Sequence, residues 1–301
     1  MRNEIRTKKY DMDVLQFAQT LRFYSPKAYQ YLRTYLELPT EATLNNHLRS
    51  FKCMPGIIGE SLDELELHKG DPDYEVASLV LDEMSIKELI EFCPDIDKGR
   101  AFGGIDYGDK FNLEEADTRP ANSALVCLLV GYKGNWKLPI AYFFTRGLKS
   151  GVQSGIIREC ISSCHKIGVK IFNVTMDGTK HNVSAVEKLG TKIFVKELED
   201  MKSSFPHPCD DVNYEVSVYL DPIHMVKLIR NTVCDYKVLI WPNRGNVKWE
   251  YIEKLHSLQD EHGLRAANKL SNQHINYKKK IMKVSLAVQT IASRSVAVAL
   301  Q

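Results

Sequence analysis

Four aspartates stand at the ends of predicted strands, and their placement is the clearest indication of chemistry in the sequence. Asp82 lies in VLDEM, Asp106 ends GGID, Asp177 ends VTMD and Asp221 ends VYLD. Desolvating an isolated carboxylate costs several kcal/mol, and neighbouring carboxylates also repel one another. A divalent cation relieves both penalties, and carboxylate oxygens suit Mg²⁺ or Mn²⁺. These residues therefore predict metal-dependent chemistry on phosphodiesters, for which a pair of ions about 3.5–4 Å apart is suited.

Each aspartate also has a purely structural interpretation, because Asp at a strand end often caps the next helix or forms an Asx turn. Asp221 precedes Pro222 and a predicted helix, so N-capping is as well supported as a metal role. Asp177 precedes Gly178 and Thr179, where a cap also fits. One such acid is a weak indication. Asp177 with acids on the first two strands is a stronger one, since the order of the elements predicts that they converge.

The elements that would position these acids are three strands followed by alternating helices and strands. The runs YEVASLVLDEMSI, GRAFGGIDYG and SALVCLLVGYKGNWKLPIAYFFT are typical of an antiparallel meander, and Gly131–Gly134 offers a turn inside the last run. A helix at 150–168, the strand VKIFNVTMDG, the helix HNVSAVEKLG and the strand YEVSVYLDPIH follow, and then helices at 223–235, 247–275 and 277–300. This order predicts a mixed α/β sheet with flanking helices and right-handed crossovers, as in an RNase H-like fold.

The N-terminal segment has a different character. Helical periodicity over 12–36, interrupted at Ser25-Pro26, and a third helix from Glu41 to about Phe51 predict a helix-turn-helix. Residues 1–52 carry nine Lys or Arg and five Asp or Glu, a net charge of +4. The alternative is a helical protein-interaction bundle. The third helix offers side chains that can reach DNA: Thr43, Asn45, Asn46, His47 and Arg49.

Composition excludes several classes of protein. The chain has 301 residues, 44% hydrophobic and 26% charged, with a net charge of +2, so any basic surface must be local. No apolar run reaches the length of a transmembrane helix, and the first residues contain no secretory signal. The seven cysteines are therefore expected to stay reduced. Cys160, Cys164 and His165 share a predicted helix, where packing is favoured over zinc binding. The three tryptophans are expected to be packing residues rather than base-stacking platforms.

A helix that starts at Asp221 carries a polar, basic set of side chains. His224, Lys227, Arg230 and Asn231 follow at i, i+3, i+6 and i+7 from His224. Such a face suits phosphate, and an ordinary solvated helix face is an equally supported interpretation.

Several of these segments resemble P-element-type DNA transposases, including the transposase-derived proteins with THAP domains. FAQTLRFYSPKAYQYLR resembles the helix-turn-helix of that family. LVLDEMSIKE, FGGIDYGD, KLPIAYFF, VTMDGTKHN and LDPIHMVKLIRN resemble consecutive blocks of its RNase H-like core. MKVSLAVQTIASRSVAVAL resembles a helix of the domain that the family inserts into that core and that is associated with GTP. The expected organisation is a helix-turn-helix over 1–55, an incomplete RNase H-like core over 75–235 and a partial helical insertion domain over 236–301.

The resemblance implies cut-and-paste DNA transposition in the nucleus by an Asp-Asp-Glu centre with Mg²⁺ or Mn²⁺, in a homo-oligomer on transposon ends and target DNA. Asp177 is implied as the second acid. Both Asp82 and Asp106 remain open as the first, 95 and 71 residues before Asp177. Asp221 and His224 match the Asp-x-x-His motif of the family, and Lys227 is a candidate for GTP contact.

Two departures from the family pattern lead us to expect a chain truncated at both ends. No THAP zinc domain precedes the helix-turn-helix, and the third acid, a Glu, is expected beyond the insertion. Glu250, Glu253 and Glu261 fall within that insertion. Three hypotheses follow: a transposase fragment inactive by itself, a domesticated non-catalytic DNA-binding or regulatory protein, and a nucleotide-binding module over 221–301.

Overall fold

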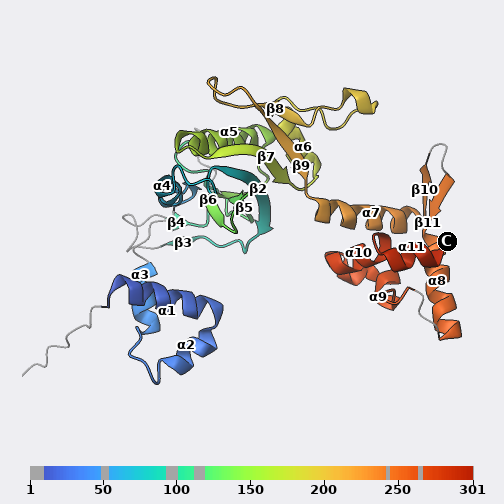
Figure 1. Cartoon of the computed structure of the whole chain (residues 1–301), viewed down its shortest axis with the longest axis horizontal. Coiled ribbons are helices and arrows are strands. Elements are labelled where there is room, and N and C mark those ends of the chain that lie inside the picture. The colour runs from blue at the N-terminus through green and yellow to red at the C-terminus, as the bar shows by residue number, and fades with distance from the viewer. Residues whose placement is uncertain are drawn as a thin grey trace, which may run out of the picture. The chain divides into compact units, whose positions relative to one another are not determined.

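A computed structural model describes residues 10–48, 54–92, 101–111, 119–241, 245–263 and 267–300 (Figure 1). The chain divides into two compact units, Met1–Met54 and Pro55–Gln301. Among the described residues, no helix combines the length and apolar character needed to cross a membrane.

The first unit contains three helices around a small core. They are α1 (Met12–Tyr24), α2 (Pro26–Leu32) and α3 (Glu41–Leu48). Ser25 separates the first two because its backbone is extended and its Oγ accepts a hydrogen bond from the N–H of Ala28, while Pro26 occupies the first turn of α2. Tyr29 is fully buried and donates its hydroxyl to the carbonyl of Pro39 at 2.5 Å. The predicted helix-turn-helix is confirmed.

The second unit contains a seven-stranded mixed sheet in the order β1-β6-β5-β2-β7-β9-β8. The central strands β2, β5 and β6 form an antiparallel meander, and β7 and β9 run parallel to β2. This is the predicted RNase H-like arrangement. The strands are β1 (Gly56–Ile57), β2 (Val76–Ser85), β5 (Ser123–Gly131), β6 (Lys137–Thr145), β7 (Lys170–Met176), β8 (Ser204–Pro206) and β9 (Glu215–Leu220).

The composition of the meander differs from the prediction. The described part of GRAFGGIDYG, residues 101–108, supplies no strand to the large sheet: β4 (Ala101–Phe102) pairs with β3 (Glu91–Phe92) in a separate ribbon. Gly103 ends β4 at φ 95°, where a Cβ would lie 1.9 Å from the carbonyl oxygen of Leu89. The single segment predicted over 123–145 instead provides both β5 and β6.

The sheet buries one face against helices. On β2, Ala77, Leu79 and Leu81 are buried and alternate with half-buried residues, so they share one face. This face packs against α5 (Ser150–Lys166), whose Ile157 and Ile161 are fully buried. The helix α6 (Lys180–Glu187) contacts α5, and α4 (Gly59–Leu67) adds Leu65 to the same core.

The remainder of the second unit is mostly helical and has its own core around Trp249 and Tyr277. The elements of this part are α7 (Pro222–Tyr236), β10 (Val238–Trp241), β11 (Gly245–Lys248), α8 (Trp249–His262), α9 (Asn272–Ile275), η2 (Tyr277–Lys280), α10 (Val284–Ile291) and α11 (Arg294–Leu300). The short helix η1 (Leu198–Asp200) lies earlier in the chain, before β8.

Two of the three predicted C-terminal helices were wrong in extent. The predicted helix 247–275 begins as β11, which pairs with β10, and a new helix starts at the Ser271 cap. The predicted helix 277–300 divides into η2, α10 and α11. Lys237, at φ 63°, ends α7 and permits the turn into the β10–β11 hairpin.

Candidate metal centre

Three of the predicted acids lie at the same level on three neighbouring strands, Asp82 near the end of β2 and Asp177 and Asp221 directly after β7 and β9. Val80 of β2 pairs with Thr175 of β7, and Thr175 pairs with Tyr219 of β9. Asp82, Asp177 and Asp221 each lie two residues further along their strand. Because neighbouring strands are about 4.8 Å apart, the backbone brings Asp82 beside Asp177 and Asp177 beside Asp221.

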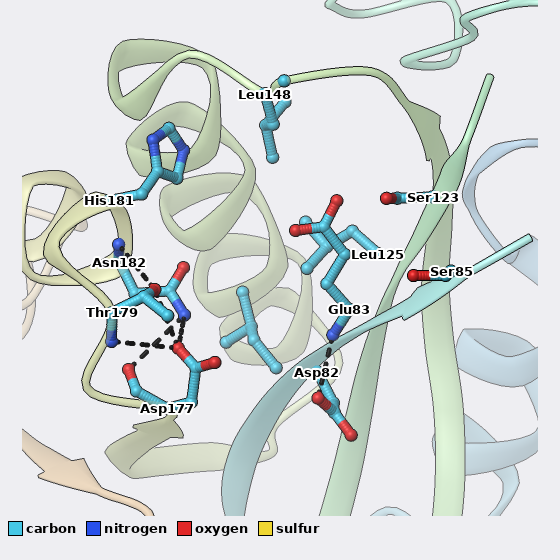
Figure 2. A pocket seen from close by; sticks show the side chains of 12 residues that line it. Asp82, Glu83, Ser85, Ser123, Leu125, Leu148, Asp177, Thr179, His181 and Asn182 are labelled. Atoms are coloured by element: carbon cyan, nitrogen blue, oxygen red, sulfur yellow. Dashed lines mark hydrogen bonds between the residues drawn. The ribbon is translucent and has the colours of Figure 1, made fainter. Parts of the chain in front are cut away.

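Asp177 is held in place by donors from the following loop and helix (Figure 2). Its Oδ1 accepts hydrogen bonds from the Thr179 N–H at 3.2 Å, from the Thr179 hydroxyl at 2.8 Å and from the Asn182 amide. The buried Gln153 of α5 donates to Oδ1 of Asn182 at 2.6 Å, which turns the Asn182 NH₂ toward Asp177. Thr179 also caps α6. The three hydrogen bonds from Thr179 and Asn182 therefore all reach the same oxygen of Asp177.

Asp82 and Glu83 point to opposite sides of β2 (Figure 2). Oδ1 of Asp82 accepts the Glu83 N–H at 2.9 Å, while Oε1 of Glu83 accepts the Thr145 hydroxyl at 2.8 Å. Both residues are exposed. They line, with Asp177, a cavity of about 450 Å³ at the ends of β2 and β7, whose other walls are Leu81, Ser85, Ser123, Leu125, Gly147, Leu148, Thr179, His181 and Asn182.

The residues present fit a hard divalent cation. Three carboxylates line this cavity, and none of its lining residues is Lys or Arg. Carboxylate, hydroxyl and amide oxygens are the ligands that Mg²⁺ and Mn²⁺ prefer. Asp82 and Asp177 would supply the charge from adjacent strands, and the donors on Oδ1 of Asp177 would fix its orientation.

Asp221 acts as a helix cap in the structure. Its carboxylate accepts the Ile223 N–H at 3.0 Å and starts α7, while its own N–H pairs with the carbonyl of Met176. This matches one of the two interpretations that the sequence left open. His224 follows on the first turn of α7 and is half-buried.

Asp106 lies elsewhere on the sheet. Its backbone bridges Phe144 of β6, and its Oδ1 accepts the Gly108 N–H at 2.9 Å. The strands β6, β5 and β2 separate this position from β7. Four strand spacings correspond to roughly 19 Å, so the sheet does not bring Asp106 and Asp177 together.

Only part of the basic face predicted on α7 is accessible to solvent. Arg230 is fully buried: Nη2 donates to the carbonyl of Ile281 at 2.9 Å, Nε donates to Oδ1 of Asn231 at 2.7 Å, and the guanidinium lies 4.0 Å from the centroid of the Tyr277 ring. Burial lowers the pKa of Arg230. Arg230 therefore holds the helical core, and both interpretations of it as a surface residue were wrong. Lys227 remains half-exposed.

The candidate DNA-contacting residues of α3 differ in availability. Asn45 and Asn46 are exposed, although Oδ1 of Asn45 accepts a hydrogen bond from Arg22 at 2.7 Å. Thr43 is half-buried, with its N–H bonded to the Thr40 hydroxyl. His47 is half-buried. Arg49 lies outside the described residues.

Sequence reasoning missed Glu83, Thr179, His181 and Asn182 as neighbours of the acids. The string DGTKHN contained a signal for two of them, since Thr179 is spaced to cap a helix and Asn182 lies three residues later on its first turn. The tryptophan prediction holds where the side chains are described: Trp136 donates to the carbonyl of Asp73 and Trp249 is fully buried.

Comparisons with known proteins match three segments of the chain to families and two curated proteins to nearly all of it. Family models match residues 1–47 ("Transposable element P transposase-like, HTH domain"), 53–190 ("TNP-like, RNase H N-terminal domain") and 223–301 ("TNP-like, GTP-binding insertion domain"). The chain is 30% identical over 298 residues to the human DNA transposase THAP9, covering 98% of the chain and 32% of that protein. It is 23% identical over 295 residues to the transposable element P transposase of Drosophila melanogaster, covering 97% of the chain and 35% of that protein.

The fold is also similar to that of a solved structure, the Drosophila P element transposase strand transfer complex. The TM-score is 0.75 at 23% identity, over 99% of this chain and 60% of that one. The chain thus spans about a third of the length of the curated relatives that it matches.

Proposed function

Since the chain belongs to the P-element-like transposase family, with helix-turn-helix, RNase H-like and GTP-binding insertion domains, we propose that it serves metal-dependent cleavage and strand transfer of DNA. The observation that carries this proposal is the placement of Asp82 and Asp177, each two residues beyond the paired Val80 and Thr175 of adjacent parallel strands, at a cavity lined by carboxylates. The activity of a whole transposase is a proposal for this chain, which spans about a third of the length of the curated relatives that it matches.

In this proposal Asp82 and Asp177 hold the cation, and Asn182 with Thr179 keeps the Asp177 carboxylate oriented. A bound Mg²⁺ or Mn²⁺ would activate the attacking oxygen and stabilise the leaving oxygen of a phosphodiester. Asp82 lies on the sheet face opposite α5, the face of the half-buried Val80. We propose that the third carboxylate implied by the family approaches from that face.

The cheapest test is Mn²⁺ binding to the full chain, measured by titration calorimetry. We expect Asp82→Asn and Asp177→Asn each to weaken Mn²⁺ binding at least about tenfold, because each removes a ligand. Asp106→Asn is the matched control and should leave the affinity unchanged. If Asp106→Asn weakens Mn²⁺ binding and Asp82→Asn does not, the assignment of the first acid fails.

Cleavage itself is tested in a longer protein that includes this chain and continues past residue 301. Asp177→Asn should abolish nicking of DNA there. Nicking that persists in this variant would refute the role of Asp177.

The main alternative is a domesticated DNA-binding or regulatory protein without chemistry. The exposed Asn45 and Asn46 of the helix-turn-helix would contact DNA in either case. Under the alternative, DNA binding should weaken steeply with salt and survive Asp177→Asn, and no longer form of the protein should nick DNA.

The remaining parts of the proposal concern the insertion domain and the assembly. We propose that GTP binds the insertion domain with Lys227 in contact with a phosphate, and that the protein acts in the nucleus as a homo-oligomer on DNA. Measurable GTP affinity without DNA affinity would instead favour a nucleotide-binding module over 221–301. A Lys227→Ala variant with unchanged GTP affinity would remove Lys227 from the site.

A further inference from the structure

A second cluster of metal-ligating side chains lies at the other end of α5 from the carboxylate cavity. His165 is in the last turn of α5, and Cys209 and Asp211 lie in the connection between β8 and β9. Nε2 of His165 is 2.9 Å from Oδ2 of Asp211. One ring nitrogen of His165, the Sγ of Cys209 and one carboxylate oxygen of Asp211 all lie within 4.8 Å of one another.

We propose that His165, Cys209 and Asp211 form a zinc site that fastens the β8–β9 connection to α5. An imidazole nitrogen, a thiolate and a carboxylate are all established ligand types for Zn²⁺. The thiolate and imidazole favour Zn²⁺ over Mg²⁺ or Ca²⁺, which prefer oxygen ligands alone. This site does not depend on the proposed DNA chemistry.

The distances require only small adjustments. Zinc bonds of about 2.0–2.3 Å in a tetrahedron separate the ligand atoms by about 3.3–3.8 Å. The Asp211 side chain is 72% exposed and that of His165 is 31% exposed, so both can move by the ångström or less that this requires. Three protein ligands leave a fourth position for water.

Neighbouring groups hold Cys209 toward α5 without an ion. The Cys209 N–H donates to Nδ1 of His207 at 3.1 Å, and its thiol donates to the Ser162 hydroxyl of α5 at 3.7 Å. His207 is only 8% exposed, and its ring centroid lies 5.3 Å from that of His165. The Nε2 of His207 is buried without a partner. His207 is therefore a positioning residue that fixes the backbone of Cys209.

Binding would exchange protons for the ion. The Cys209 thiol proton leaves to solvent, and the ring proton of His165 moves from Nε2 to Nδ1 by exchange with solvent, so that the Nε2 lone pair is available to the ion. The ion then links residues that are 44 positions apart in the chain, which is why no compact zinc motif appears in the sequence. Proton release on metal binding is the general consequence.

The experiment uses the full chain without a histidine tag, freed of metal by a chelator and kept in excess Mg²⁺ to occupy the carboxylate cavity. Co²⁺ is titrated in as a spectroscopic probe, and the thiolate-to-cobalt charge-transfer band is recorded. Zn²⁺ affinity is then measured by competition with Co²⁺. Peptide mapping after alkylation reports whether Zn²⁺ protects Cys209.

We expect a 1:1 charge-transfer band in the wild-type protein that is absent in Cys209→Ser. His165→Gln and Asp211→Asn should each weaken Zn²⁺ binding by about a hundredfold or more, since loss of a ligand exceeds the 10–100-fold effect of an outer-shell partner. The exposed neighbour Asp210 provides the matched control, and Asp210→Asn should bind as the wild type does. Asp177→Asn should also leave the band unchanged, which separates this site from the carboxylate centre.

Absence of the band in the wild type, its survival in Cys209→Ser, or equal effects of Asp210→Asn and Asp211→Asn would each overturn the proposal. Should the variants fail to fold, the wild-type protein still decides the matter. Alkylation of Cys209 that is equally fast with and without Zn²⁺ would refute the site.

Discussion

Replacement of Arg230 tests whether its guanidinium stabilises the helical core or binds phosphate. Its truncation in Arg230→Ala removes the hydrogen bonds to Asn231 and Ile281 and the contact with the Tyr277 ring. Hydrogen bonds to charged groups are worth about 1.5–3 kcal/mol each and a desolvated cation–π contact about 2 kcal/mol. The cost of burying the charge offsets several kcal/mol of this. We therefore expect Arg230→Ala to lower the free energy of unfolding by about 3–5 kcal/mol, including the cavity it leaves.

Arg230→Met provides the second point of the series. Methionine occupies a similar volume and carries no charge, so the burial cost disappears together with the favourable contacts. The carbonyl of Ile281 then loses its donor, at about 1–3 kcal/mol. The expected loss is smaller than for alanine, about 0–2 kcal/mol. Lys227→Ala, on the same helix but half-exposed, is the control and should change stability by less than about 0.5 kcal/mol.

The assay is urea unfolding followed by tryptophan fluorescence, together with hydrogen exchange of α7. Trp249 is fully buried in the same core, 6.4 Å from Tyr277 between ring centroids, and reports that core directly. Binding of GTP is measured on the same variants. If Arg230→Ala kept wild-type stability but lost GTP affinity, the guanidinium would be a ligand and the structural interpretation would be refuted.

Three further perturbations test other contacts. Asn182→Ala should weaken Mn²⁺ binding about 10–100-fold without unfolding the protein, because it removes one of the donors that orient Oδ1 of Asp177; calorimetry giving wild-type affinity would contradict this. Burial raises the pKa of Tyr29 above its ordinary 10.0, so its contribution to stability is intact below pH 10.0 and is lost as the pH rises from there through the folded-state pKa. Urea midpoints should therefore fall more steeply above pH 10.0 in the wild type than in Tyr29→Phe, and parallel curves would refute the assignment. Gly131→Ala would place a Cβ 2.2 Å from Nε1 of Trp136, so we expect a loss of about 1–3 kcal/mol and a shift in tryptophan emission; unchanged emission and stability would show that the ring moves freely.

The parts of the fold that sequence reasoning predicted correctly are those with strong local signals. An apolar run with β-branched residues predicted β2, and the glycines at 131 and 134 marked the turn between β5 and β6. Ser25 and Pro26 fixed the break between α1 and α2 because both a cap and a first-turn proline were present. These signals act over a few residues and need no knowledge of the rest of the chain.

The predictions that were wrong concern residues and strands whose partners are distant in the sequence. The charge of Arg230 predicted exposure, but Tyr277 and Ile281, about 50 residues later, surround it. The prediction assigned no element to β10 and started a helix at residue 247, within β11, since each strand of this hairpin has four residues and depends on its partner. The cluster of His165, Cys209 and Asp211 could not be predicted for the same reason, since His165 is 44 positions from Cys209 in the sequence.

The choice between Asp82 and Asp106 illustrates this limit within the candidate site itself. Both aspartates precede Asp177 in apolar surroundings, and the spacings of 95 and 71 residues cannot separate them, because loops between strands vary in length at little energetic cost. Sheet order is what differs. β2 pairs directly with β7, whereas the backbone of Asp106 bridges Phe144 of β6. A cation bound through two carboxylates needs them on adjacent strands, so the topology favours Asp82, and the Mn²⁺ titration of the two asparagine variants decides between them.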